Sequence, residues 1–199
     1  MAQIEVPADR TLPVTAVPGE DGWQHMRIAF NDSPVADSWV FGELGVDHAR
    51  FVFVDADALS CWEHLRPLDG LADLVLLGRD QEQVAAEFGA PRLGDPADVE
   101  YGWVDLPVKD AYQRGLAIEQ RRNEPGGPKF AFDFRPHSHH WQMMRAVRES
   151  DHEAGVIRVG EADILMAMTS VGDGFFPVHL DVDADGLPVA LRIDIARED

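Results

Sequence analysis

The stretch FFPVHLDVDADGLPVALRIDI, residues 175–195, determines the fold class that we expect for this chain. Apolar and polar residues alternate on both sides of Asp185-Gly186, a dipeptide that is typical of a two-residue hairpin turn. The pairs that such a turn predicts are Val178 with Ile193, Leu180 with Leu191, and Val182 with Val189. All these apolar side chains then share one face of an antiparallel pair, so the hydrophobic pattern supports the register.

The pattern continues upstream of this hairpin. A near-continuous apolar run over 162–170 is followed by the turn Gly172-Asp173-Gly174, which predicts a three-stranded antiparallel meander over 162–195. Helical spacing and capping residues predict helices over 56–65, 81–88, 107–123 and 139–149. Short β patterns predict strands over 11–17, 23–30, 50–54, 71–77, 101–104 and 130–134. The expected fold is therefore α+β, a mostly antiparallel sheet with helices packed on one face.

The chain has 199 residues and no Pro/Gly/Ser-rich linker, which predicts a single globular domain over 1–199. Asp and Glu total 36 and Lys and Arg total 17, for a net charge of −19. Such a charge repels phosphates, so we expect neither a nucleic acid nor an anionic membrane as partner.

The charge is uneven along the sequence, with a mildly basic segment over 108–150 between two acidic ends. Two interpretations stay open. The acidic ends either keep a solvated surface soluble or present a face to a cationic protein partner.

The N-terminal residues contain neither a basic segment nor an apolar run of membrane-spanning length. We therefore expect no signal peptide, no membrane span and a cytoplasmic location. The single cysteine excludes an intrachain disulfide.

One candidate binding site follows from the turn before the hairpin. Gly172 and Gly174 would let the backbone approach a ligand closely beside the carboxylate of Asp173. We predict a binding set of Gly172, Asp173, Gly174 and His179, while a tight turn explains the same glycines without a ligand.

A second candidate is a histidine cluster directly before the last predicted helix. Asp133, His137, His139 and His140 offer carboxylate and imidazole ligands of the kind that zinc and other transition metals take. The H-x-H-H spacing matches no established metal motif, so polar loop histidines are the default interpretation and no metal is expected. A metal site at these four residues stays open as the alternative. No cofactor is expected, because the chain contains no glycine-rich phosphate loop, and the lack of G-x-S-x-G gives no support for a serine nucleophile.

A family resemblance rests on the same C-terminal stretch. The segment TSVGDGFFPV, residues 169–178, followed by Asp183-Ala184-Asp185-Gly186, resembles the closing hairpin of a bacterial group, the domain-of-unknown-function family four-two-four-one. The segments at 27–30, 45–47 and 51–57 are more loosely similar to earlier parts of that family. The resemblance implies a compact bacterial cytoplasmic protein and assigns no catalytic residues.

These observations together predict a non-catalytic acidic binding protein, of the immunity type, that masks a cationic protein partner. Whether the chain is an enzyme stays open. One alternative is a small metal-dependent hydrolase that uses the histidine cluster over 137–140 together with Asp173. Another is a structural subunit of a larger assembly. The sequence predicts no oligomeric state.

Overall fold

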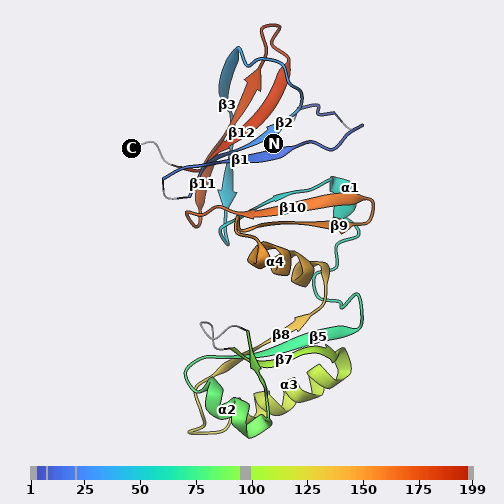
Figure 1. Ribbon diagram of the computed structural model, residues 1–199, viewed down its shortest axis with the longest axis vertical. Helices are drawn as coiled ribbons and strands as arrows, with labels where there is room; N and C mark the ends of the chain where they lie inside the picture. The colour runs from blue at the N-terminus through green and yellow to red at the C-terminus, as the bar shows by residue number, and fades with distance from the viewer. Residues whose placement is uncertain (1–3, 8, 21, 95–99, 197–199) are drawn as a thin grey trace. The chain divides into compact units, whose positions relative to one another are not determined.

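The apolar residues of this chain gather into more than one core, and the backbone divides accordingly. A computed structural model describes residues 4–7, 9–20, 22–94 and 100–196 (Figure 1). One compact unit is formed by Met1–Phe53 with Met166–Asp199, and the other by Val54–Leu165. Helices make up 20% and strands 42% of the structure, and the sheets are mostly antiparallel, so the predicted α+β class is confirmed. The single globular domain over 1–199 stays a prediction beside this division.

The first unit contains a five-stranded antiparallel sheet with the order β1-β2-β12-β11-β3. Its strands are β1 (Val14–Pro18), β2 (Trp23–Ala29), β3 (Asp37–Val46), β11 (Gly174–Val182) and β12 (Pro188–Asp194). The predicted strands over 11–17 and 23–30 form the hairpin of β1 and β2. The first and last parts of the sequence therefore share one sheet, with Phe30, Leu180 and Val182 in a common buried cluster.

The register of the hairpin formed by β11 and β12 is confirmed for two of the three predicted pairs, Val178 with Ile193 and Leu180 with Leu191. The third predicted pair is wrong. Val182 lies opposite Pro188 rather than Val189, because the register shifts after Asp181.

The turn of this hairpin explains the shift. The N–H of Asp183 donates to the carbonyl of Leu187 at 3.0 Å, so the loop between them holds three residues instead of the predicted two. Gly186 adopts φ 77° in the left-handed region, as is usual for the last residue of a three-residue hairpin loop. The carboxylate of Asp183 also accepts the N–H groups of Asp185 and Leu187, which favours the longer loop.

The predicted three-stranded meander is corrected in its first strand. That strand, β10 (Ala162–Met168), belongs to a sheet with the order β4-β10-β9, together with β4 (Arg50–Phe53) and β9 (Ala154–Val159). The N–H of Thr169 donates to the carbonyl of Ala49 at 2.8 Å, which places the end of β10 beside the start of β4. A continuous apolar strand carries no local signal for its partner, so neighbourhood in sequence was a poor guide here.

The second unit contains a four-stranded sheet with the order β6-β7-β5-β8. Its elements are β5 (Leu71–Leu77), β6 (Arg92–Leu93), β7 (Glu100–Pro107), β8 (Ala131–Pro136), and the helices α2 (Gln81–Phe88) and α3 (Val108–Arg122). Leu74 and Leu76 of β5 pack with Val84, Ala85 and Ile118 of the two helices in one core, and all of them are buried. The run LADLVLL forms a strand because β5 has a neighbour on each side and its apolar side chains are buried.

Among the predicted helices, the first differs most from the observed structure. Helix α1 (Ala56–Leu59) is one turn long, although the pattern predicted 56–65, whereas α4 (His139–Glu149) has the predicted bounds. After α1, Cys61 donates its N–H to Ala58, three residues back, so the backbone leaves the α-helical hydrogen-bond pattern there. In the part of the chain that the structure describes, no helix combines the length and hydropathy needed to cross a membrane.

Asp80, at the start of α2, gives a prediction about pH. Hydrogen bonds from Arg79 and from the N–H of Lys129 lower the pKa of Asp80 to about 2. Since the unfolded chain has an aspartate pKa of about 3.9, the ionised carboxylate stabilises the fold above that pH. The stabilisation is lost as the pH falls from about 4 to about 2.

We expect Asp80→Asn to lower the unfolding free energy at neutral pH. The difference in unfolding free energy between wild type and variant should shrink as the pH falls from about 4 to about 2. Urea unfolding at a series of pH values measures it, and a deficit independent of pH would contradict the assignment.

Candidate metal centre

The centre starts from one acidic residue inside a buried strand. Asp73 lies in the middle of β5, and its neighbours Ala72 and Leu74 are fully buried. Asp73 itself is only 7% exposed. A buried carboxylate is costly unless donors or a cation compensate it, so its partners indicate what the site is built to hold.

A bulge in the neighbouring strand brings the second acid to Asp73. In the pairing of β5 with β7, Ala72 lies opposite Leu106 and Leu74 opposite Trp103. Two residues of β7 therefore face the single residue Asp73, and one of them, Asp105, has φ 54°, an unusual value for a residue other than glycine. The N–H of Asp105 donates to Asp73 Oδ1 at 3.0 Å.

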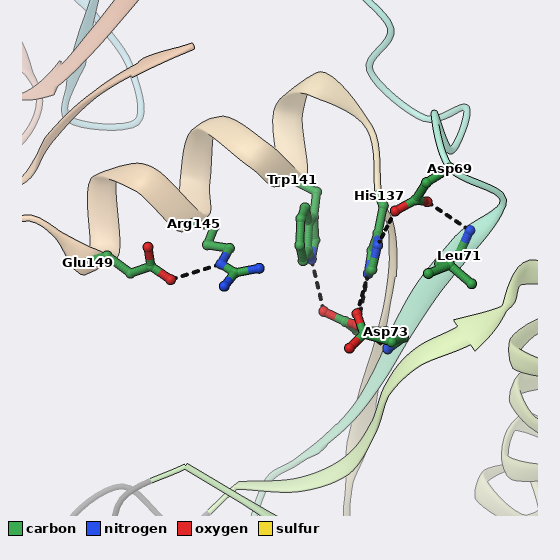
Figure 2. A network of polar contacts seen from close by, with 8 residues as sticks. Asp69, Leu71, Asp73, His137, Trp141, Arg145 and Glu149 are labelled. Atoms are coloured by element: carbon green, nitrogen blue, oxygen red, sulfur yellow. Dashed lines mark hydrogen bonds and ion pairs between the residues drawn. The ribbon is translucent and has the colours of Figure 1, made fainter.

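The third group is His137, at the end of β8. Two backbone hydrogen bonds position this residue: its N–H donates to the carbonyl of Leu71, and its carbonyl accepts the N–H of Leu68. The buried imidazole therefore lies between two carboxylates, with Nδ1 2.9 Å from Asp69 Oδ2 and Nε2 3.0 Å from Asp73 Oδ1 (Figure 2). Nε2 also lies 3.8 Å from Asp105 Oδ1.

Helix α4 covers this group with an aromatic ring. The Ser138 hydroxyl caps the helix by accepting the N–H of Trp141, so the helix begins at His139, two residues after His137. The Trp141 indole stacks on the imidazole with 3.9 Å between ring centroids and a 20° interplanar angle. Its Nε1–H donates to Asp73 Oδ2 at 2.9 Å. Figure 2 shows Arg145 and Glu149 on the next turns of the same face of α4.

The pKa shifts describe a strong negative potential at the imidazole. Burial alone would lower the pKa of His137, but the hydrogen bonds to Asp73 and Asp69 outweigh it and raise the pKa above 6.5. Burial likewise opposes ionisation of Asp69, yet the bonds from His137 and the Leu71 N–H lower its pKa below 3.8. The carboxylates therefore favour a positive charge at this point.

One atom each from Asp73, Asp105 and His137 lie within 4.8 Å of one another, and this is the group of potential metal ligands found among the described residues. Two ligand atoms bound to zinc at about 2.1 Å with a tetrahedral angle lie about 3.4 Å apart. The observed separations from His137 Nε2, 3.0 Å to Asp73 and 3.8 Å to Asp105, bracket that value. These two separations are compatible with a shared metal ion.

The structure does not gather the metal set that the sequence suggested. Of Asp133, His137, His139 and His140, only His137 reaches the centre. His139 accepts the N–H of Glu63 at its Nδ1 and stacks on Trp62. The ring of His140 lies against His64 at 4.5 Å, and Asp133 pairs with Arg135 at 2.7 Å.

The predicted binding set belongs to the first unit, whereas the residues of the candidate metal centre belong to the second. Asp173 Oδ1 accepts the N–H of Ala49 at 2.7 Å, and the Gly172 carbonyl accepts the hydroxyl of Thr169. Gly174 begins β11, and His179 Nε2 on that strand lies 3.0 Å from Asp194 Oδ2. Asp173 and Gly172 thus stabilise a turn, and ligand binding at this set stays a prediction.

Sequence reasoning missed Asp69, Asp73, Asp105 and Trp141. One signal was present, because Asp73 is the only charged residue in the apolar run over 71–77. A lone acid in an otherwise apolar strand is expected to have a buried partner. The bulge that places Asp105 had no such signal.

Comparisons of the chain with family models, with curated proteins and with solved structures gave no match. The family resemblance of the C-terminal hairpin therefore stays a prediction, and only the geometry of the site indicates a function.

Proposed function

We propose that this protein binds one divalent transition-metal ion, of the zinc type, through Asp73, Asp105 and His137, and uses it for hydrolysis. The observation that carries the proposal is the arrangement around His137. Asp69 holds Nδ1, which leaves Nε2 directed toward the carboxylates of Asp73 and Asp105.

The surroundings of the three ligands support the proposal. Metal-binding histidines usually donate their second ring N–H to a carboxylate, and ligating carboxylates usually accept hydrogen bonds from outside the site. Asp69 supplies the first of these partners, and the Trp141 Nε1–H supplies the second at Asp73 Oδ2. A structural salt bridge alone would not need the exposed carboxylate of Asp105, which the bulge directs toward the same nitrogen.

The charges around the imidazole favour a dication over a proton. Asp69, Asp73 and Asp105 face His137, so an imidazolium leaves two negative charges uncompensated. A dication beside a neutral imidazole leaves only one negative charge uncompensated. Metal and proton compete for Nε2, because a ligating histidine must be neutral.

The number of ligands supports hydrolysis rather than a structural role. Structural zinc sites are closed by four protein ligands, whereas catalytic sites keep one position for water beside three. Asp73, Asp105 and His137 provide three. A metal at such a site lowers the pKa of its bound water and supplies hydroxide near neutral pH.

The test changes the side chain of Asp105, because its carboxylate is exposed. The hydrogen bond from Asp105 to Asp73 is made by the backbone N–H, so a substitution of the side chain keeps that bond. We expect the chelator-treated protein to bind Zn²⁺ with one-to-one stoichiometry in calorimetry. Asp105→Asn should fold normally and bind Zn²⁺ at least about 10-fold more weakly. His137→Asn should abolish binding.

The matched control is His140→Asn, which removes a histidine of the predicted cluster that lies against His64 instead of the centre. Its zinc affinity should equal that of the wild type. Equal losses in Asp105→Asn and His140→Asn, or binding unaffected by Asp105→Asn, would show that the zinc binds elsewhere and overturn the proposal.

Masking of a cationic partner by a cytoplasmic protein stays a prediction, and one fact weakens its electrostatic basis. The first unit has 15 acidic and 5 basic residues, and the second has 21 and 12. Each unit therefore has a similar net negative charge. The basic segment over 108–150 folds into the same unit as residues 54–107, the second half of the acidic segment before it, so the two units do not separate the charge pattern of the sequence.

A further inference from the structure

A cleft of about 230 Å³ lies between β8 and α4 of the second unit. Four side chains of its wall are positive or can donate hydrogen bonds: Arg135, Arg148, His140 and, from the loop between α1 and β5, His64. The wall also holds one carboxylate, that of Asp133, which pairs with Arg135 and leaves the charge of Arg148 in excess. This gathering is unusual in a chain with a net charge of −19. Such a cleft favours an anionic ligand over a neutral or cationic one.

Arg148 is the most informative residue of this wall. Among the described residues, every other arginine makes a hydrogen bond, an ion pair or a ring contact. Arg148, near the end of α4, makes none although acidic residues outnumber basic ones about two to one. A guanidinium offers five N–H donors and is suited to the oxygens of a phosphate or carboxylate.

The cleft adjoins the candidate metal centre. The Trp141 side chain forms part of the cleft wall and also donates its Nε1–H to Asp73. Arg135 of the wall lies directly opposite Asp73 in the antiparallel pairing of β5 and β8. Directly opposed residues have Cβ atoms about 4.5–5.5 Å apart, so a molecule in the cleft lies close to the centre.

We infer that the cleft binds the phosphate group of a phosphorylated substrate, with Arg148 as its main charged contact and the two histidines as further donors. What happens to the substrate after binding rests on the proposed function, since the metal would act on the part of the molecule nearest Asp73. Binding of the phosphate itself requires only the cleft. The exposed Leu65 and the half-buried Met144 in the same wall offer contacts to an apolar part of the substrate.

The experiment titrates inorganic phosphate into ¹⁵N-labelled, metal-free protein and follows the amide resonances. We expect saturable shifts for residues lining the cleft, in α4 and around His64. Arg148→Gln should weaken binding at least about tenfold, since hydrogen bonds to charged groups contribute this much or more. The matched control is Arg158→Gln, because Arg158 on β9 pairs with Asp163 and does not line the cleft. Its affinity should stay at the wild-type value.

A repeat of the titration on Asp105→Asn separates this inference from the proposed function. Phosphate binding at wild-type strength in this variant supports the cleft even if calorimetry finds no zinc. Shifts that do not saturate, or that are the same in Arg148→Gln and wild type, overturn the cleft inference. Phosphate binding that appears only after zinc is added, and is indifferent to Arg148→Gln, also overturns it and leaves the metal proposal standing.

Discussion

Gly102→Ala is expected to destabilise the second unit by at least about 3 kcal/mol. Gly102 lies in β7 opposite Val75 of the central strand β5. A Cβ added there would lie 2.2 Å from the carbonyl oxygen of Leu74 and 2.9 Å from the Cα of Val75. Both are backbone atoms, so no rotation of a side chain can relieve the clash, and the two strands would have to separate where the sheet covers its core.

Gly42→Ala is the matched control, because Gly42 also lies in a strand, β3, and an added Cβ there meets nothing within 4 Å. Its unfolding free energy should stay within about 0.5 kcal/mol of the wild type. Urea unfolding followed by circular dichroism compares the two variants. Equal stabilities of Gly102→Ala and Gly42→Ala would mean that β5 and β7 are not packed as closely as the structure has them.

Asp73→Ala is expected to cost about 3–5 kcal/mol in metal-free protein at about pH 6. The carboxylate of Asp73 accepts bonds from His137 Nε2, Trp141 Nε1 and the N–H of Asp105. Alanine leaves all three donors without this acceptor and leaves a cavity beside a buried imidazole. Removing one partner of a buried ionic group costs far more than the pair contributes in water, because the other charge stays desolvated.

Asp133→Ala is the control for this change. Asp133 lies on the adjacent strand β8, but its side chain is 49% exposed and pairs with Arg135 near solvent. An exposed ion pair contributes about 1 kcal/mol or less, so the loss should be correspondingly small. If the two variants unfold at the same urea concentration, the hydrogen bonds to Asp73 do not stabilise the fold as we describe.

Local patterns predicted most elements of this fold. The bounds of α2 and α4 follow from the spacing of apolar side chains and from residues that begin or end a helix, such as Ser138 and Gly89. The hairpin of β11 and β12 follows from strict alternation around a turn. These signals lie within about ten residues of one another, so they can be recognised without knowing the rest of the chain.

The candidate site was predicted only in part. The sequence predicted no metal, and its alternative metal set grouped His137 with His139, His140 and Asp133, its neighbours along the chain. Residues adjacent at a strand end and helix start point in different directions, and the structure separates these side chains accordingly.

The amino-acid sequence by itself determined the α+β class, most helices and strands, and the excess of negative charge, because these depend on composition and short-range periodicity. Only the tertiary structure decided that β10 joins β4 and β9, and that His137 meets acids 64 and 68 residues earlier in the chain. Strand pairing and a bulge such as that at Asp105 are settled by packing of the whole core. The pairing brings together carboxylates that no local pattern connects, and the burial it creates gives them their affinity for a cation.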